Sequence, residues 1–392
     1  MVKIIEETSH AVAEAVKAVN PGVIAAYPIT PQTHIVERIS DWVANGELPS
    51  SEYIRVESEF SAISACLGAS ATGVRTYTSS SSQGLALMHE VLFIVSGMRL
   101  PVGMTCVNRS LSAPINIWND HSDSMAERDS CWLQFHTETA QESYDLTLMQ
   151  YKISENHDVM LPSMVCLDGF TLSHVYEPVS LPTQEEVDKF LPLYKPFHAV
   201  LDPDDPLTLG PIAFPEHFME FRKTQEDAIN GSLKVIEDVF KEYTKTFPVE
   251  IENSRPNEYW HFEKYLMEDA EIALVAMGSM CGTIKCVVDK LREKGEKVGL
   301  LKLITYRPFP KEELKKALKN VGKIAVLEKA FSAGSGGILY HELGMLFYED
   351  DERPKLRNFI VGLGGRDVLL NHIEKIYELT NQDKGQKEEW VF

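Results

Sequence analysis

Tyr27-Pro28-Ile29-Thr30-Pro31-Gln32-Thr33 lies between a short apolar run at residues 23–26 and an amphipathic stretch at residues 35–42. A stretch with two prolines continues neither a strand nor a helix, so it predicts a rigid loop at the carboxyl end of a strand. Open α/β sheets bind their ligands at this edge. Thr30 is the polar side chain between the prolines, and two interpretations of it are open: a hydroxyl in a binding site, or the cap of the following helix.

Strand and helix patterns alternate along the rest of the chain. In the first 175 residues, strands are predicted at residues 23–26, 53–56, 74–78, 102–107 and 164–167. After residue 270 they are predicted at residues 272–277, 298–303, 324–327 and 359–361. Strands separated by helices of this length indicate βαβ units and parallel sheets. We therefore expect an α/β fold, with a doubly wound parallel sheet followed by a smaller α/β domain.

A chain of 392 residues is too long for one ordinary core, and we expect three parts. Residues 1–175 form the first domain and residues 261–392 the second. Residues 176–260 are rich in proline and charge and contain one long polar helix, from about residue 216 to 245. We interpret this segment as a connecting arm that packs with the first domain, rather than as a core.

Composition excludes several classes of function. The net charge is −20, which argues against nucleic acid and against anionic membrane surfaces. We find no apolar run long enough to span a bilayer, and the acidic start of the chain does not resemble a secretory signal. We therefore predict a cytoplasmic protein.

The six cysteines are scattered, with no C-x-x-C pair. Cys281 and Cys286 are closest to each other, but four residues separate them and no second pair exists. Zinc and iron–sulfur sites need denser spacing. The sequence thus predicts no metal-binding residue on this chain.

Two charged residues follow other predicted strands at the edge that carries Thr30. Glu59 opens a helix after the strand at 53–56, and Arg109 follows the strand at 102–107. A guanidinium at this edge can hold a carboxylate through two hydrogen bonds. Each residue also has a structural interpretation, because a first-turn carboxylate suits the helix dipole and a loop arginine is often solvated. Together with Thr30 they predict one site.

Two other motifs are interpreted as structural. Residues 362–365 (Gly-Leu-Gly-Gly) lack the full G-x-G-x-x-G spacing of a dinucleotide loop and predict a tight turn. The serine run at residues 79–82 lacks the G-x-S-x-G elbow of a nucleophile loop.

Further motifs occur in a fixed order along the chain: Glu57-Ser58-Glu59, Ser82-Gln83-Gly84-Leu85, Asn108-Arg109, Asn119-Asp120-His121, Asp168-Gly169-Phe170, Met277-Gly278-Ser279 and Tyr306-Arg307-Pro308-Phe309-Pro310. With residues 27–31, they closely resemble the α subunits of the 2-oxoacid:ferredoxin oxidoreductase family, of the pyruvate synthase type. The resemblance covers nearly the whole chain. It is more specific for the family than for the substrate.

The resemblance implies a pyrimidine-type thiamine diphosphate-binding domain followed by a transketolase C-terminal-like domain. Glu59 matches the family glutamate that hydrogen-bonds the aminopyrimidine ring, where a carboxylate favours the tautomer that accepts a proton from the thiazolium carbon. Thr30 and Arg109 match the residues that hold the 2-oxoacid. Three more residues are expected at the cofactor: Tyr27, Pro28 and Ile29.

The resemblance also implies partner subunits. The Gly-Asp-Gly motif that binds the diphosphate through Mg²⁺ is not found in this sequence. By analogy with the family, the diphosphate and Mg²⁺ belong to a β subunit, the iron–sulfur clusters to a ferredoxin-like δ subunit and the coenzyme A contacts to a γ subunit. The chain alone is then inactive. The implied reaction converts pyruvate, CoA and oxidised ferredoxin reversibly into acetyl-CoA, CO₂ and reduced ferredoxin.

Three alternatives stay open at this point. The same scaffold could act on oxalate or 2-oxobutyrate, although no extra cationic residue marks a second carboxylate site. The chain could be a non-catalytic scaffold, or half of a thiamine enzyme without iron–sulfur chemistry. Asn119 and Cys131 stand where many relatives have glycine, which bears on the choice of 2-oxoacid.

Overall fold

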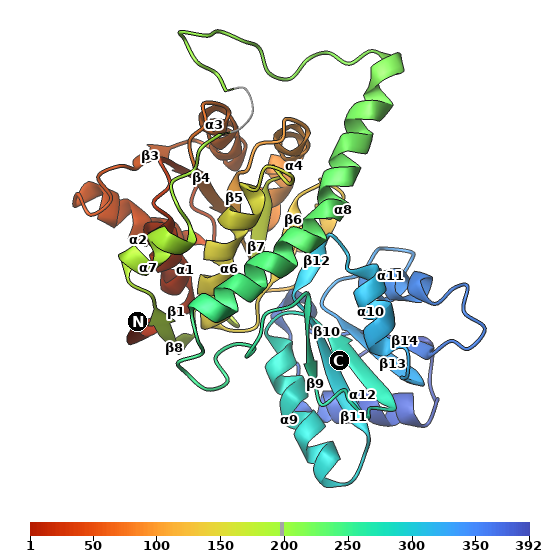
Figure 1. Cartoon of the computed structure of the whole chain (residues 1–392). Coiled ribbons are helices and arrows are strands. Elements are labelled where there is room, and N and C mark those ends of the chain that lie inside the picture. The colour runs from red at the N-terminus through yellow and green to blue at the C-terminus, as the bar shows by residue number, and fades with distance from the viewer. Residues whose placement is uncertain (197–199) are drawn as a thin grey trace.

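The structure is a computed structural model that describes residues 1–196 and 200–392. It contains two α/β units, one built on a seven-stranded sheet and one on a six-stranded sheet (Figure 1). The long helix α8 (Pro215–Thr246) runs along the first unit and leads to the second.

The seven-stranded sheet has the strand order β12-β6-β7-β5-β4-β2-β3. Its strands are β2 (Val23–Ala26), β3 (Glu52–Arg55), β4 (Thr76–Ser80), β5 (Gly103–Asn108), β6 (Leu133–His136), β7 (Ser163–Asp168) and β12 (Thr305–Arg307). All neighbours are parallel except β12, which pairs antiparallel with β6. The chain order reverses at β2, since β3 lies on one side of it and β4 on the other. Such a switch point opens a crevice at the carboxyl ends of the strands.

Helices cover both faces of this sheet. They are α1 (Thr8–Val19), α2 (Thr33–Ala44), α3 (Glu59–Ala71), α4 (Ser82–Gly97) and α6 (Ala140–Ser154), with the short α5 (Ser122–Ala126) above the carboxyl edge. Side chains alternate along the strands, so that Val107 of β5 packs with α1 and α2, whereas Met104 and Cys106 pack with α3 and α4. The expected doubly wound parallel sheet is confirmed.

The segment at residues 176–260 packs on the first unit. It contributes β8 (Tyr176–Leu181), which pairs antiparallel with β1 (Val2–Glu7), and α7 (Gln184–Phe190). The second half of α8 buries Ile236, Val239, Phe240 and Tyr243 in the same cluster as residues of α6, so this half belongs to a core. Residues 197–199 of the predicted arm lie outside the described residues.

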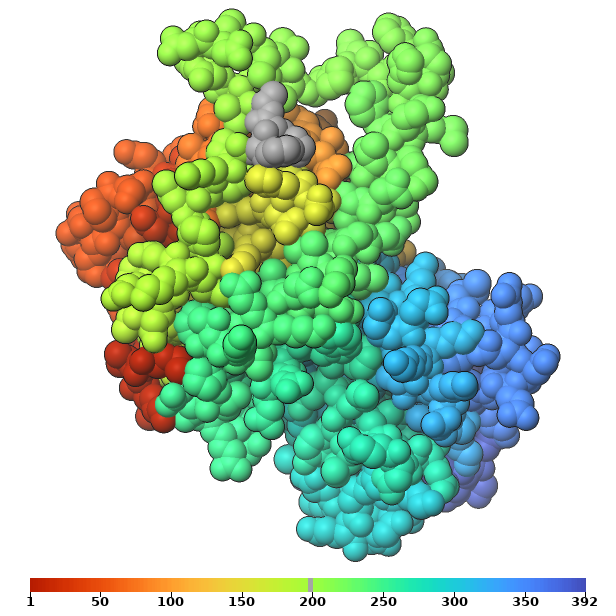
Figure 2. All heavy atoms as spheres, in the orientation of Figure 1, coloured from red at the N-terminus to blue at the C-terminus, as the bar shows by residue number. Residues whose placement is uncertain are grey.

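The beginning of α8 is different. Figure 2 shows that its first turns and the segment before it stand away from the body. This part exposes large apolar side chains: Ile212, Phe214, Phe218, Met219 and Phe221. Among the described residues, no helix combines the length and apolarity needed to cross a bilayer.

The six-stranded sheet has the order β15-β14-β13-β10-β11-β9. Its strands are β9 (Phe262–Tyr265), β10 (Ile272–Ala276), β11 (Val298–Leu303), β13 (Lys323–Glu328), β14 (Lys355–Ile360) and β15 (Glu388–Trp390). Helices α9 (Met280–Glu293) and α12 (Leu370–Asn381) cover one face, and α10 (Lys311–Leu318) and α11 (Ile338–Leu346) cover the other. A short 3₁₀ turn, Leu363–Gly365, follows β14.

The sequence analysis did not predict the short strands β6 and β12. β6 has four residues, two of them polar, and β12 has three residues and joins a sheet whose other strands lie far earlier in the chain. The strand predicted at 74–78 runs from 76 to 80, so it includes two residues of the serine run. Because β12 belongs by sequence to the second part, the two parts share a sheet, and the division at residues 175 and 260 stays a prediction.

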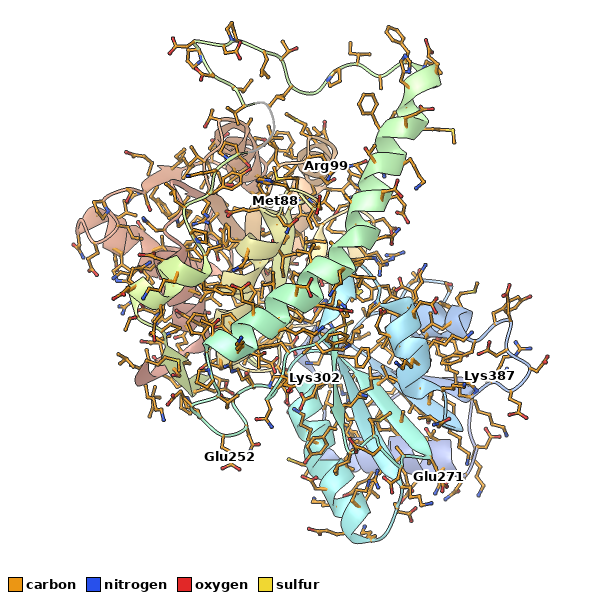
Figure 3. The ribbon with its side chains drawn as sticks, viewed as in Figure 1. Met88, Arg99, Glu252, Glu271, Lys302 and Lys387 are labelled. Carbon is orange, nitrogen blue, oxygen red and sulfur yellow. The ribbon has the colours of Figure 1, made fainter. Side chains whose placement is uncertain are left out.

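A buried cation joins the two units. Lys302 of β11 lies at their junction (Figure 3), and its ammonium contacts three carboxylates at 2.6–2.7 Å: Glu138, Glu142 and Glu263. Burial alone would lower the pKa of Lys302, but the three carboxylates outweigh burial and hold this pKa well above its usual value. Two of them belong to the first unit, so the ion pairs link the units.

We expect Lys302→Met to lower the free energy of unfolding by about 3–5 kcal/mol, because it leaves the buried Glu142 without its cation. Equilibrium unfolding in urea measures this change. Lys297→Met is the matched control, since Lys297 pairs with Glu271 at 2.8 Å and both side chains are exposed. It should cost less than about 1 kcal/mol. Equal losses in the two variants would contradict a structural role for the buried cluster.

Candidate active site

The loop at residues 27–33 is anchored by Gln32, which is fully buried. Its side-chain amide donates to the main-chain oxygen of Ser79 at 3.0 Å and to the Ser79 hydroxyl at 2.7 Å, and its Oε1 accepts from the N–H of Ile29. The loop is therefore fixed on the end of β4.

Thr30 is exposed on this loop. Helix α2 begins at Thr33 and its N-cap is Gln32, so the interpretation of Thr30 as the helix cap is wrong. Within the described part of the chain, no group hydrogen-bonds the Thr30 hydroxyl. Tyr27 and Pro28 are exposed and Ile29 is half-buried, so their role at a cofactor stays a prediction.

Arg109 directly follows β5 and reaches the Thr30 loop. Its Nη1 donates to the main-chain oxygen of Thr30 at 2.9 Å, and its Nε donates to that of Asn116 at 2.9 Å. Burial lowers the pKa of Arg109 and Asp123 partly offsets this, yet a guanidinium stays charged at neutral pH. Nη2 has no protein partner among the described residues. The structure thus brings Thr30 and Arg109 together and leaves one guanidinium nitrogen for a ligand.

Glu59 is the first residue of α3, whose N-cap is Ser58. Its side chain lies against Gly84, where an added Cβ would come within 2.6 Å of both the Glu59 Oε1 and the Ser80 hydroxyl. A side chain at position 84 would therefore displace the carboxylate. Glycine at this position lets α4 approach α3 closely.

Glu59 is only 7% exposed, and its carboxylate has no hydrogen-bond partner among the described residues. The neighbouring Ser80 hydroxyl is also buried and unpaired. Burying a carboxylate without a partner is costly, whereas a carboxylate that only suits a helix dipole is free to stay in water. The pair is suited to a ligand that donates hydrogen bonds.

The serine run at the end of β4 connects these loops. Ser79 holds Gln32, Ser81 donates to the main-chain oxygen of Val107 at 2.7 Å, and Ser82 donates to that of Ser110 at 2.5 Å. Ser79, Ser81 and Ser82 are thus structural, whereas the hydroxyl of Ser80 has no partner among the described residues. Thr30, Glu59 and Arg109 therefore lie around one strand end.

Asp123 was not identified from the sequence, although it organises the same edge. Its carboxylate is buried and accepts four N–H hydrogen bonds, from the main-chain groups of Ser82, Arg109 and Ser124 and from the amide of Asn108, at 2.7–2.9 Å. The Cys106 thiol also donates to it, at 3.7 Å. Burial raises the pKa of Asp123 to about 6, although the four donors oppose this rise. No sequence motif marks the residue, because its partners are mainly main-chain groups.

The second unit supports the loop that holds Arg109. Asn116 donates to the main-chain oxygen of Gly364 at 3.0 Å, and the N–H of Gly364 donates to Asp120 at 3.1 Å. Gly364 has φ +62°, and a Cβ there would lie 2.6 Å from the Asn116 amide. The predicted tight turn at 362–365 is confirmed, and its glycine allows this close approach.

Asp168, at the end of β7, ties the same edge to the second unit. It contacts His121 at 2.7 Å, Lys329 at 2.8 Å and the hydroxyl of Ser279. Burial would raise the pKa of Asp168, but Lys329 and His121 outweigh burial and hold this pKa well below its usual value. Lys329 and Ser279 follow strands of the second sheet, so the carboxyl edges of the two sheets meet here.

Asn119 and Cys131 occupy different places. Asn119 is buried in the loop above the edge, and its main-chain oxygen accepts from Gly365 at 2.6 Å. Cys131 packs toward α8 and has φ +63°, a conformation that favours glycine. Only Asn119 thus lies on the loop that supports Arg109.

Comparisons with known proteins identify the family of this chain. Residues 14–241 match the family model for pyruvate flavodoxin/ferredoxin oxidoreductase, thiamine diphosphate-binding, and residues 270–373 match pyruvate:ferredoxin oxidoreductase core domain II. The chain belongs to the pyruvate:ferredoxin oxidoreductase family. It therefore contains a thiamine diphosphate-binding domain.

Curated relatives align along almost the whole chain. Pyruvate synthase subunit PorA of Methanocaldococcus jannaschii is 52% identical over 99% of this chain and 98% of its own length. The PorA subunit of Pyrococcus furiosus is 49% identical, covering 96% and 93%. Ketoisovalerate oxidoreductase subunit VorA of Pyrococcus abyssi is 44% identical, also covering 96% and 93%. The family thus includes relatives named for different 2-oxoacids.

Solved structures share the fold. The 2-oxoglutarate:ferredoxin oxidoreductase of Magnetococcus marinus superposes with a TM-score of 0.72 at 18% identity over 95% of this chain, which spans 65% of that longer chain. A split-gene transketolase superposes with a TM-score of 0.54 at 14% identity, covering 95% of this chain and 99% of the other. Each superposition covers 95% of this chain, so both α/β units share their fold with these enzymes.

We expect Asp123→Asn to lower the free energy of unfolding at pH 7 by about 1–3 kcal/mol, because an amide NH₂ would face hydrogen-bond donors. Asp129→Asn is the control, since Asp129 is exposed and 3.9 Å from Arg128, and it should change little. Urea unfolding of both variants makes the comparison.

The same carboxyl predicts a pH dependence. Its pKa is raised from the usual 3.8 to about 6 in the native state, so the native state binds more protons between these values. The contribution of Asp123 to the free energy of unfolding should therefore decrease as the pH rises from about 4 to about 6. Asp123→Asn should remove this part of the profile. An unchanged profile in the variant would contradict the assignment.

Proposed function

We propose that this chain is the α subunit of a multisubunit pyruvate:ferredoxin oxidoreductase. The complex would convert pyruvate, CoA and oxidised ferredoxin reversibly into acetyl-CoA, CO₂ and reduced ferredoxin. One observation carries the proposal: a buried, unpaired carboxylate lies beside the Thr30–Arg109 pair, in a chain about half identical to pyruvate synthase subunits over nearly its full length.

Glu59 fits the aminopyrimidine half of thiamine diphosphate. Its carboxylate can hold a proton shared with a ring nitrogen, and the buried Ser80 hydroxyl beside it offers a second polar contact. When bound, thiamine diphosphate supplies the nucleophilic carbon and the electron sink for decarboxylation. In this proposal Glu59 favours the ring tautomer needed for proton transfer, and the packing of α3 on α4 around Gly84 holds its side chain in place.

Arg109 and Thr30 fit the substrate. The free Nη2 of Arg109 can bind the carboxylate of a 2-oxoacid, and the Thr30 hydroxyl can donate to its carbonyl oxygen. Nη1 and Nε are already engaged with main-chain oxygens, so the guanidinium is held in one orientation before the substrate arrives. Such preorganisation lowers the entropic cost of positioning. Tyr27, Pro28 and Ile29 complete the wall of this site in our proposal.

Partner subunits would supply the rest of the site. Asp168-Gly169 is the segment of this chain closest to a Mg²⁺-binding motif, but Asp168 is already neutralised by Lys329. This supports placing Mg²⁺ and the diphosphate on a β subunit, with iron–sulfur clusters on a δ subunit and CoA contacts on a γ subunit. The exposed apolar side chains at the start of α8 fit a contact with a subunit of this cytoplasmic complex.

We expect Glu59→Ala in the assembled complex to slow hydrogen/deuterium exchange at the thiazolium carbon by at least about 100-fold, because general acid–base contributions reach this size. NMR of quenched samples measures the exchange. Glu57→Ala is the control, since Glu57 is exposed two residues earlier, and it should exchange at the wild-type rate. If Glu59→Ala also exchanges at that rate, the chain is a scaffold and not a catalytic subunit.

Arg109→Lys should raise the KM for pyruvate by about tenfold or more, because an ammonium group cannot keep the two main-chain contacts and also reach the substrate carboxylate. Exchange at the thiazolium carbon should stay near the wild-type rate. Arg99→Lys is the control: Arg99 also donates to main-chain oxygens, at 2.6 and 3.1 Å, but lies beyond the opposite end of α4. Steady-state kinetics with pyruvate, 2-oxobutyrate and oxalate test the substrate, and a higher kcat/KM for another acid would overturn the choice of pyruvate.

A further inference from the structure

A cluster of histidine and glutamate side chains lies where α1 and α2 begin. Glu7, His10 and His34 each place one potential ligand atom within 4.8 Å of those of the other two. Glu7 is buried, and the two histidines are partly exposed. The cluster therefore combines carboxylate and imidazole groups at a site that an ion can reach from solvent.

The local structure brings these residues together from three segments. Glu7 ends β1 and is the N-cap of α1, and His10 stands one helical turn later on the same face. His34 is the second residue of α2. Main-chain bonds from Thr8 and Ser9 hold the start of α1 against residues 173–175, the loop that follows β7. The positions of the groups are thus set by secondary structure rather than by a loose loop.

The contacts within the cluster pair each imidazole with a carboxylate. His34 Nδ1 lies 2.6 Å from Glu7 Oε1, and His10 Nδ1 lies 3.1 Å from Glu6 Oε1. The ring of His174 packs against that of His34, with centroids 4.4 Å apart. When the histidines are neutral, the two glutamates leave the cluster negatively charged, which favours a cation.

We propose that Glu7, His10 and His34 form a binding site for a divalent transition-metal ion such as Zn²⁺. Imidazole nitrogens and a carboxylate oxygen are suitable ligands for Zn²⁺, and three protein ligands leave a fourth position for water. Ligand atoms of a tetrahedral ion stand about 3.3 Å apart, so small side-chain shifts within the observed spread suffice. Glu6, beside His10, would orient that ring from outside the metal.

A second cluster of carboxylates is less suited to a metal ion. Glu138, Glu142 and Glu263 are also close together, but the ammonium group of Lys302 already lies among them and Lys285 contacts two of them. That cluster is neutralised by lysine. Around Glu7, His10 and His34, no lysine or arginine forms an ion pair in the described part of the chain.

The proposed ion would act structurally. It would tie the end of β1 and the first turn of α1 to the first turn of α2, which begins directly after the loop at residues 27–33. Loss of the ion would release His34 and with it one anchor of α2. The catalytic loop itself stays fixed by Gln32, so the site stabilises the fold more than it affects chemistry.

Isothermal titration of the metal-stripped full chain with ZnCl₂ tests the proposal. The exposed thiol of Cys286 also binds Zn²⁺, so all variants are made in a Cys286→Ser background. We expect one saturable site per chain, weakened at least about 100-fold in His10→Ala and in His34→Ala, because loss of an outer partner alone costs up to that factor. His89→Ala is the control, since His89 pairs with Glu127 at 2.7 Å without a second histidine.

Two results of this titration would overturn the proposal. No saturable binding in the parent chain, or equal affinity in His34→Ala and the parent, overturns the proposal. Absorption of the Co²⁺-loaded parent chain gives an independent test, because nitrogen and oxygen ligands in a four-coordinate site give intense visible bands and hydrated Co²⁺ does not. Circular dichroism checks that the variants fold. If they do not, the Co²⁺ spectrum of the parent decides: intense bands support the site, and their absence overturns it.

Discussion

The buried carboxylate of Asp123 is the interaction on which the functional edge depends. Four donors from the ends of β4 and β5 and from α5 converge on its two oxygens, which fixes the main chain of Ser82 and Arg109. An ionised carboxylate is costly to bury, and these hydrogen bonds compensate for the loss of water. The end of β4 also anchors Gln32. The Asp123 carboxylate and this strand end therefore position the segments that carry Thr30, Glu59 and Arg109.

The second unit also positions residues at the candidate site of the first unit. Its turn at Gly364 holds Asn116, which holds Arg109, and its Lys329 neutralises Asp168 beneath the same loops. Lys302 adds a further junction among carboxylates of both units. Buried ion pairs contribute less to net stability than to specificity, since a misplaced unit would leave charges unpaired. The relative placement of the units thus helps to orient Arg109.

The sequence predicted the longer strands and helices of this structure. It also predicted that Thr30, Glu59 and Arg109 lie at one edge of the first sheet. Strands such as β5 and β7 are rich in apolar residues and buried at every position, and the prolines of the 27–33 loop indicate the end of a strand. β6 and β12 were missed because they are short and because β12 joins a sheet formed by distant residues. Asp123 and Gln32 were missed for another reason: their partners include main-chain groups, which leave no pattern in the side chains. The turn at Gly364 was predicted, but its contacts with Asn116 and Asp120 were not, because these residues lie far apart in the chain. The cluster at Glu7, His10 and His34 was likewise hidden, because 24 residues separate the two histidines.

The packing around Glu59 explains how this chain can hold an unpaired carboxylate in place. Packing of α3 on α4 around Gly84 buries the carboxylate, while the unpaired Ser80 hydroxyl leaves a second polar group beside it. Both groups are held by a scaffold whose other buried charges are neutralised within the chain, as at Lys302 and Asp168. Glu59 and Ser80 are thus unpaired groups at the carboxyl edge of the sheet, although other buried side chains of the described chain, such as those of Ser70 and Ser154, are also unpaired. A ligand that donates to Glu59 would remove this cost, so the same feature that weakens the free chain would favour binding of such a ligand.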